Sequence, residues 1–505
     1  MTNENTVDNA KVQINPIPIV GVIILGAFVA ILNQTLMNVA LPQIMNKLEI
    51  TANTAQWLTT VFMLVNGVLI PVTAYLMGRF TTRQLFITAM TLFSIGTLVC
   101  GVAPGFNTLV AGRVIQAAGA GILMPLMTNV ILSVFPIEKR GKAMGVIGIA
   151  MIFAPAIGPT LSGWIVQNYS WRVLFFMILP IGILDVILAI FLLKNVTERT
   201  FPKPDVLGII LSTIGFGGIL YGFSTAGNKG WTNAEVLVTL GVGIVALLLF
   251  VWRQLVHDDP MLEFRVFRYW MFSLSTIINI IITMAMFAAM ILVPIYLQNI
   301  RGFTPLESGL LLLPGAILMG IMSPITGAIF DKIGPRWLAV VGLAITVITT
   351  YMFANLTDDM SYLTLIIMYS ARMFGMSMLM MPIMTAGLNA LPQRWNAHGT
   401  AMVNTIRQVA GSVGTALLIT VMTNQTKAHL TEMAKEQQVG PQMKAQFAHL
   451  TNEATIYGLN DAFLVATGMA LLAFILAFFL RKPKPADDLD PRGTGKIEEK
   501  AVKGN

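Results

Sequence analysis

Long apolar stretches alternate with short polar segments along most of the chain. A helix needs about 20 predominantly apolar residues to cross the hydrocarbon core of a bilayer, and such stretches carry few charges. The pattern therefore predicts an all-α membrane protein with fourteen transmembrane helices, at residues 17–40, 55–77, 84–103, 107–134, 143–166, 173–193, 206–226, 234–252, 271–297, 305–327, 336–355, 362–390, 399–422 and 461–480.

The composition agrees with this prediction. Of the 505 residues, 55% are hydrophobic and 11% are charged, whereas about a quarter of the residues in a soluble domain are charged. The single cysteine, Cys100, excludes a disulfide framework and a cysteine-rich metal site, and we expect no metal and no cofactor. The net charge of +8 is spread over short loops, so we expect no nucleic-acid partner.

The lysine and arginine residues predict the orientation. With the N-terminus inside, they are about three times as frequent in the predicted cytoplasmic segments as in the outer ones, and such an excess is typical of the cytoplasmic side. We therefore expect a multi-pass protein of the cell membrane with both termini in the cytoplasm. Residues 1–15 are polar and lack the pattern of a cleaved signal peptide.

Three pairs of matching segments indicate an internal repeat. The loop at Gly78 matches the loop at Asp331, Arg113 matches Arg372, and GKAM at 141–144 matches GTAM at 399–402, all at similar offsets. The pairs indicate two parallel six-helix halves plus an inserted helix pair, an arrangement that places a substrate site between the halves. The predicted divisions are a cytoplasmic tail (1–16), an N-terminal six-helix bundle (17–193), a linker with two additional transmembrane helices (194–270), a C-terminal six-helix bundle (271–480) with an extracellular loop (423–460), and a cytoplasmic tail (481–505).

The fifth predicted helix contains the sequence GIAMIFAPAIGPTLSG at residues 148–163. Pro155 and Pro159 each remove a backbone hydrogen-bond donor and strain the helix. Gly158 and Gly163 provide small positions that another helix can approach closely. We expect this stretch to take part in conformational switching.

This stretch resembles the antiporter motif of major facilitator exporters, with Gly148, Pro155, Gly158, Pro159 and Gly163 in the matching positions. Further segments resemble the fourteen-helix branch of drug:proton antiporters, in the same order: 33–42, Trp57, Arg113 to Pro125, 171–182, 294–315 and 404–414. The resemblance implies a secondary active exporter that exchanges protons for amphipathic drugs or toxic compounds by alternating access. It also implies a small-molecule substrate and a monomer in a lipid bilayer. A further implication is that the protein is a transporter rather than an enzyme.

The chain departs from the family pattern at several positions. Asn33 stands where many relatives carry an aspartate, and Ser162 stands where a glycine is usual. The first signature loop has Gly78 in place of an aspartate, whereas the second copy is intact, with Gly327, Asp331, Gly334 and Arg336. We expect the second loop to contribute more to a latch between conformations.

Ionisable groups are costly inside a bilayer, so each is a functional candidate. Asp185 is the deepest acid in the predicted helices and is a candidate for proton coupling; the alternative is an ion pair within its own bundle. Arg113 either faces the cavity, where it steers a proton or holds a carboxylate, or packs against backbone carbonyls. Glu307 and Asp461, at the predicted starts of helices, either couple protons or stabilise the helix N-termini.

Polar residues provide further candidates for the substrate cavity. The same residue types also form hydrogen bonds between helices, so both roles stay open for each of them. The cavity candidates are Asn33, Gln34, Asn38, Trp57, Gln116, Asn279, Arg372, Asn404, Arg407 and Gln408. Within residues 423–460, the apolar spacing indicates two short amphipathic helices separated by Gly440 and Pro441, which either cap the outer mouth or form a solvated connector.

Two other functions fit parts of the pattern. The same architecture serves an exporter of a lipid, a fatty acid or an endogenous metabolite. A polytopic membrane enzyme would need clustered catalytic groups, and the four histidines are scattered. The chain has no GxxxxGK[ST] sequence, so we do not expect direct use of ATP.

Overall fold

The computed structural model describes residues 16–50, 52–197, 199, 201, 204–257, 260–436 and 444–482. Within these residues every regular element is helical, and fourteen segments are long and apolar enough to cross a membrane. Helices satisfy their own backbone hydrogen bonds, which makes them suitable for a bilayer that offers no water. The predicted fold class is confirmed.

The N-terminal half contains six helices: α1 (Pro16–Leu48), α2 (Ala52–Arg79), α3 (Thr82–Gly101), α4 (Phe106–Val134), α5 (Arg140–Asn168) and α6 (Arg172–Leu192). The inserted pair consists of α7 (Val206–Lys229) and α8 (Ala234–Val256). The C-terminal half contains α9 (Trp270–Ile295), α10 (Pro305–Ile333), α11 (Pro335–Phe353), α12 (Tyr362–Ser377), α13 (Met380–Leu388), α14 (Asn396–Glu436) and α15 (Lys444–Ala477). α12 and α13 together form one membrane span.

Local sequence signals explain several helix boundaries. Thr81 and Gln84 form a capping box at the start of α3, and Thr304 and Glu307 form another at the start of α10. Reciprocal hydrogen bonds of this kind satisfy backbone N–H groups that the first helical turn leaves free. Gly334 separates α10 from α11 with a φ of 81°, a conformation that favours glycine.

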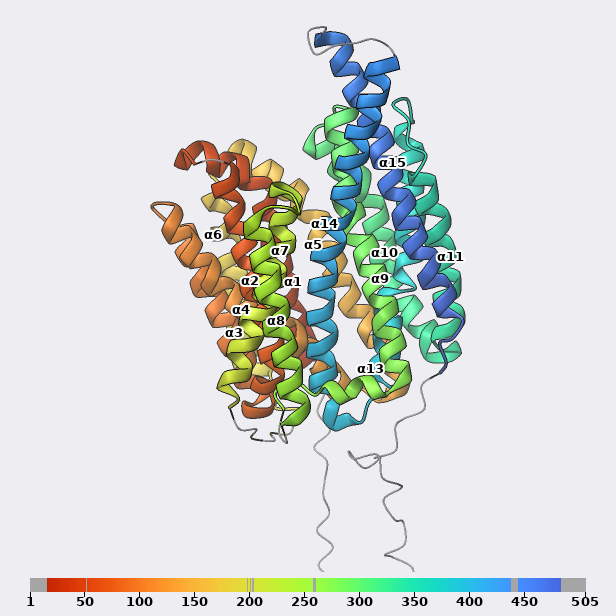
Figure 1. Cartoon of the computed structure of the whole chain (residues 1–505). Coiled ribbons are helices and arrows are strands. Elements are labelled where there is room, and N and C mark those ends of the chain that lie inside the picture. Colours follow the sequence, from red (N-terminus) through yellow and green to blue (C-terminus); the bar gives the residue numbers. More distant parts are fainter. Residues whose placement is uncertain are drawn as a thin grey trace, which may run out of the picture.

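The two halves lie side by side and contact each other along two seams (Figure 1). α5 of the N-terminal half packs against α10, and α2 packs against α14. The inserted helix α7 lies against both α2 and α14, so the pair covers the second seam. Both described ends of the chain lie at the bottom of Figure 1, which we call the terminal end of the bundle.

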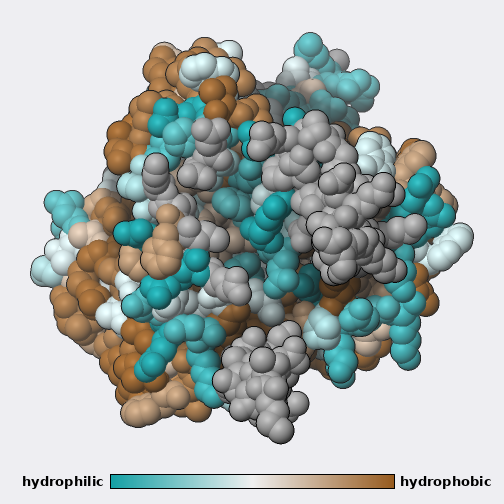
Figure 2. All heavy atoms as spheres, turned by 90° about the horizontal axis from the view of Figure 1, so that it is seen from below, coloured by the Kyte–Doolittle hydropathy of each residue, from teal (hydrophilic) through white to brown (hydrophobic). Residues whose placement is uncertain are grey.

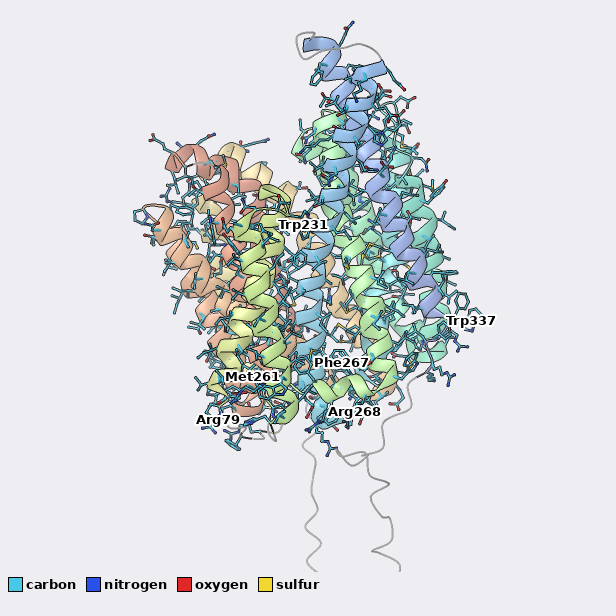
Figure 3. The ribbon with its side chains drawn as sticks, viewed as in Figure 1. Arg79, Trp231, Met261, Phe267, Arg268 and Trp337 are labelled. Carbon is cyan, nitrogen blue, oxygen red and sulfur yellow. The ribbon has the colours of Figure 1, made fainter. Side chains whose placement is uncertain are left out.

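The surface at the terminal end matches this arrangement. Hydrophilic side chains gather on the face that is seen from below, and hydrophobic side chains lie around its rim (Figure 2). Among the side chains labelled in Figure 3, Arg79 and Arg268 lie at the terminal end, whereas Trp231 lies toward the opposite end. A polar face with an apolar rim is expected for one end of a bundle that spans a membrane.

The segment 423–460 corrects one expectation. As the apolar spacing predicts, a helix lies on each side of residues 437–443, but neither is a separate short helix: one is the continuation of α14 as far as Glu436, and the other is the beginning of α15 from Lys444. These extensions project beyond the other helices at the end opposite the termini (Figure 1). Thr426 of α14 packs where a Cβ at Gly458 of α15 would lie, so close packing between the two helices supports the extension.

Candidate functional site

A polar network surrounds Arg113 inside the N-terminal half. The Arg113 side chain is 0% exposed and donates hydrogen bonds to Asn33 Oδ1 of α1 (2.9 Å), Gln116 Oε1 (2.7 Å) and the carbonyl oxygen of Leu58 in α2 (3.2 Å). Gln116 in turn donates to Thr97 Oγ1 of α3, at 2.7 Å. Four helices therefore meet at this network.

The charge of Arg113 has no carboxylate partner among the described residues. Its Nη2 atom is buried without a hydrogen-bond partner among the same residues, and its guanidinium lies 4.1 Å from the centroid of the Phe62 ring. A cation over an aromatic face is stabilised by the ring quadrupole, which partly offsets the cost of burial. At Asn33 the group that faces Arg113 is a neutral amide, so the contact there is a hydrogen bond rather than an ion pair.

Arg372 has a similar environment in the C-terminal half. It is 1% exposed, and its Nη2 atom donates to the carbonyl oxygen of Ala285 in α9, at 3.2 Å. The Nε atom of Arg372 is buried without a hydrogen-bond partner in the described part of the chain. Both repeated arginines are thus buried cations that bind backbone carbonyls of other helices.

Asp185 of α6 is fully buried, and neither of its carboxylate oxygens has a hydrogen-bond partner in the part of the chain that the structure describes. It faces α1 at Gly26, where an added Cβ would lie 2.7 Å from Asp185 Oδ2, and the same position is close to Phe86 and Met90 of α3. The alternative of an ion pair within the bundle is therefore not observed. An ionised carboxylate without a partner is costly in such an apolar pocket.

The two outer acids have local partners. Glu307 accepts hydrogen bonds from the N–H (2.8 Å) and the hydroxyl (2.9 Å) of Thr304, so it stabilises the start of α10. Asp461 corrects another expectation, because it lies inside α15 rather than at the start of a helix. Its carboxylate contacts His429 Nε2 at 2.9 Å and accepts a hydrogen bond from Gln425 at 3.1 Å, both from α14.

The remaining cavity candidates are dispersed. Asn279 and Asn404 donate to carbonyl oxygens one turn earlier in their own helices, at 3.1 and 2.9 Å. Trp57 stacks on Tyr221 of α7 with a centroid distance of 5.5 Å. Gln34, Arg407 and Gln408 are half-buried, and Gln408 lies at the seam with α2, where its Cγ is 3.4 Å from the Cβ position of Gly67. The side chain of Asn38 lies outside the described residues.

The antiporter-like stretch of α5 packs against α1. A Cβ at Gly158 would overlap Thr35 Oγ1, and Ser162 donates a hydrogen bond of 2.7 Å to the carbonyl oxygen of Leu36. Close approach of another helix to Gly163 is not observed in the described part of the chain, where no atom beyond its chain neighbours and its own helix backbone lies within 4 Å of its Cβ position. Pro155 is half-buried, and the side chain of Pro159 lies outside the described residues.

The second signature loop joins the two halves at the terminal end. Asp331 Oδ1 accepts a hydrogen bond from the N–H of Gly141 (2.9 Å), and Oδ2 accepts one from the N–H of Lys142 (3.0 Å). A Cβ at Gly327 would overlap the Gly141 carbonyl. Asp331 therefore caps the first turn of α5 from the opposite half, where a negative charge also complements the helix dipole. Arg336 binds elsewhere, donating from Nε to the Leu480 carbonyl oxygen at 2.9 Å.

A second contact across the same seam was not among the expected residues. Arg140 Nη1 donates to Asn389 Oδ1 of the C-terminal half at 3.0 Å, while its other nitrogens donate to the carbonyl oxygens of Leu132 and Phe135. In the sequence, Arg140 stands three residues before the predicted helix 143–166, and in the structure it begins α5. Its partner was not visible in the sequence, because the two residues are 249 positions apart.

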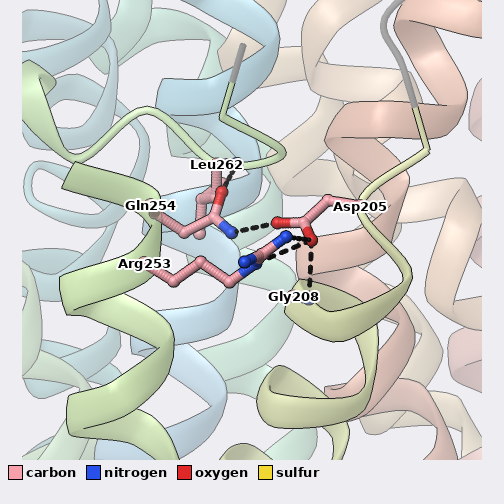
Figure 4. A network of polar contacts seen from close by, with 5 residues as sticks. All are labelled: Asp205, Gly208, Arg253, Gln254 and Leu262. Atoms are coloured by element: carbon pink, nitrogen blue, oxygen red, sulfur yellow. Dashed lines mark hydrogen bonds and ion pairs between the residues drawn. The ribbon is translucent and has the colours of Figure 1, made fainter. Parts of the chain in front are cut away.

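A polar network joins the two helices of the inserted pair, and its residues were not among those predicted from the sequence (Figure 4). Asp205 caps α7 by accepting from the N–H of Gly208 (2.8 Å) and binds Arg253 (2.8 Å) and Gln254 (2.7 Å) of α8. Burial alone would raise the pKa of Asp205, but the hydrogen bonds from Arg253, Gly208 and Gln254 outweigh it and lower the pKa below its usual range. An aspartate directly before an apolar stretch is a capping signal that could have identified it.

Comparison with known proteins decides the family. The sequence profile of the Major Facilitator Superfamily matches residues 23–415 of this chain. The chain belongs to this superfamily. It is 52% identical over 501 residues to the MFS-type transporter YhcA of Bacillus subtilis (strain 168), with 94% of each chain covered. It is 43% identical over 481 residues to the lincomycin resistance protein LmrB of the same organism, covering 95% of this chain and 98% of LmrB.

A solved structure shows the same fold at low sequence identity. The human organic anion transporter MFSD10 (TETRAN) aligns with a TM-score of 0.63 and 11% identity, covering 91% of this chain and 99% of MFSD10. Membership of the Major Facilitator Superfamily confirms the resemblance that the motifs indicated. The protein is a multi-pass membrane transporter of small molecules rather than an enzyme.

Proposed function

We propose that this Major Facilitator Superfamily protein exports amphipathic drugs or other toxic compounds in exchange for protons. The observation that carries the proposal is the seam between α5 and α10, where Asp331 of one half caps a helix of the other half through two backbone hydrogen bonds. Such a joint holds the terminal end together with few bonds and can be opened without disrupting either bundle. The name of LmrB, a lincomycin resistance protein, supports a drug as the substrate.

The proposed location is the cell membrane, with both termini in the cytoplasm and the chain acting as a monomer. The excess of lysine and arginine on the terminal side supports this orientation. The joint between Asp331 and α5 then closes the cytoplasmic end, and its opening gives access from inside. Alternating access requires closed and open arrangements of this kind on the two sides of a site between the halves.

For proton coupling we propose Asp185 as the titrating group. Its burial without a partner among the described residues supports this role, because a change of charge there changes the free energy of the packing around α1, α3 and α6. Arg113 acts as a fixed cation in the same half, and the amides of Asn33 and Gln116 orient it. Glu307 and Asp461 stay candidates of second rank because both have local partners.

Transport by purified protein in proteoliposomes tests this proposal. An imposed proton gradient should drive accumulation of lincomycin or another amphipathic drug, and a protonophore should abolish it. Cells that express the protein should grow better across a panel of such drugs than cells that express an Asp331→Ala variant. Uphill transport driven by sodium or ATP without a proton gradient would contradict the proposal.

A further inference from the structure

A groove of about 300 Å³ lies on the seam between the halves near the terminal end. This volume is at the lower limit of ligand pockets. Its lining comes from both halves: Lys142 of α5 and Pro324, Ile325, Ala328, Ile329 and Lys332 of α10. The groove lies directly beside the joint, because Gly327 packs against Gly141 and Lys142.

The exposed surface of α10 beside the groove is apolar. Ile321, Ile325, Ile329 and Ile333 are exposed and lie four residues apart, so they form one stripe along α10. An exposed apolar stripe on a membrane-spanning helix contacts acyl chains. Trp337 of the neighbouring helix α11 is 60% exposed (Figure 3), and exposed tryptophans are typical of the headgroup level of a membrane.

Two lysines stand at the groove and come from opposite halves. Lys142 and Lys332 are both exposed, and neither forms an ion pair with an acid in the described part of the chain. Asp331, the neighbour of Lys332, directs its carboxylate at backbone N–H groups. Because the Asp331 carboxylate is engaged by the backbone of α5, the two lysine ammonium groups stay available to a ligand, and basic pockets between membrane helices bind anionic lipid headgroups.

We propose that this groove binds one anionic phospholipid. An acyl chain lies along Ile325, Ala328 and Ile329, and the phosphate lies between Lys142 and Lys332. A lipid in this position touches both halves, so it stabilises the arrangement in which the terminal end is closed. The inference concerns a structural lipid and does not depend on which compound the protein exports.

Lipid binding to the full chain in detergent micelles tests the proposal, with phosphatidylglycerol, phosphatidylcholine and glycerol phosphate as probes. Native mass spectrometry measures lipid retention, and thermal unfolding measures stabilisation. We expect phosphatidylglycerol to be retained and to raise the unfolding temperature, and Lys142→Gln/Lys332→Gln to weaken its binding on the order of tenfold. The control Lys139→Gln/Lys194→Gln removes the same charge from exposed lysines outside the groove and should retain the lipid.

A third variant tests the apolar part of the groove. Ala328→Trp fills the groove without changing the charge and should also reduce lipid retention. If this variant does not fold, the comparison of Lys142→Gln/Lys332→Gln with its control tests the proposal by itself. Equal binding of phosphatidylglycerol to both lysine pairs, or no binding to the parent protein, would overturn the proposal. If glycerol phosphate raised the unfolding temperature as much as phosphatidylglycerol does, the groove would bind anions without an acyl chain. This result would also overturn the proposal. Export assays of the same variants keep the outcome separate from the proposed transport function.

Discussion

The guanidinium of Arg113 on α4 and the side-chain amide of Asn33 on α1 are joined by a hydrogen bond of 2.9 Å. The same guanidinium also binds the Gln116 side chain and the Leu58 carbonyl, and no acid pairs with it in the described part of the chain. One buried cation therefore holds three helices of the N-terminal half together through neutral partners.

Arg113→Ala should destabilise the protein, because three buried acceptors would lose their donor at once. At about 1–3 kcal/mol for each unsatisfied buried group, we expect a loss of roughly 3 kcal/mol or more in the free energy of unfolding. Denaturant unfolding in detergent measures this. Arg268→Ala is a suitable control, since Arg268 is exposed at the terminal end. Equal stability of the two variants would contradict a central role for the Arg113 network.

Gly158→Leu should impair transport without preventing membrane insertion, because the new side chain would overlap Thr35 of α1. Gly163→Leu is a matched control on the same helix, since no described atom of another helix lies within 4 Å of its Cβ position. Transport rates at equal expression distinguish the variants. Equal transport rates of the two variants would show that the transport cycle does not depend on the close contact between α5 and α1. Pro155→Leu should also impair exchange by restoring a backbone donor in α5.

Asp331→Asn should loosen the joint at the terminal end. The amide retains one acceptor but loses the negative charge at the start of α5, which contributes about 0.3–2 kcal/mol. Distances between spin labels on α5 and α10 near this end should shift toward longer values. Asp358→Asn removes the same charge from an exposed loop and should leave the distances unchanged. Identical distributions in both variants would show that Asp331 does not hold the halves together.

Asp185→Asn should keep its thermal stability and lose proton coupling. The carboxylate has no hydrogen-bond partner among the described residues, so the substitution leaves no partner unpaired, while the amide cannot titrate. Proton release on addition of substrate to purified protein should disappear. Release that survives Asp185→Asn but is lost in Asp461→Asn would place the coupling site at Asp461. A lower unfolding temperature together with normal release would make Asp185 structural.

Asp205 should make the stability of the inserted pair depend on acidic pH. Because its folded-state pKa is lowered, its contribution is fully present above the ordinary aspartate pKa of about 3.9 and is lost as the pH falls through the folded value. At neutral pH, Asp205→Asn should cost about 1–2 kcal/mol and should flatten the pH dependence below about pH 4. Thermal unfolding across this range checks both expectations; an unchanged acid profile would show that Asp205 contributes little.

The sequence by itself determined the membrane class, the fourteen spans and the superfamily. These properties depend on local features, namely the length of apolar stretches that a bilayer requires and motifs that lie within single helices or loops. The role of Gly334 is also a local feature that the sequence determines, because the turn between two consecutive helices requires its positive φ.

Only the tertiary structure decided which polar residues meet. The spacing of Arg113 left cavity and packing roles open, and its partners Leu58 and Asn33 are 55 and 80 positions away. The sequence also predicted two short helices within residues 423–460, in a loop outside the spans, because polar residues end an apolar span. The helices α14 and α15 continue there because they pack on each other, as Thr426 and Gly458 show. Contacts between distant segments, which no local pattern encodes, determined these features.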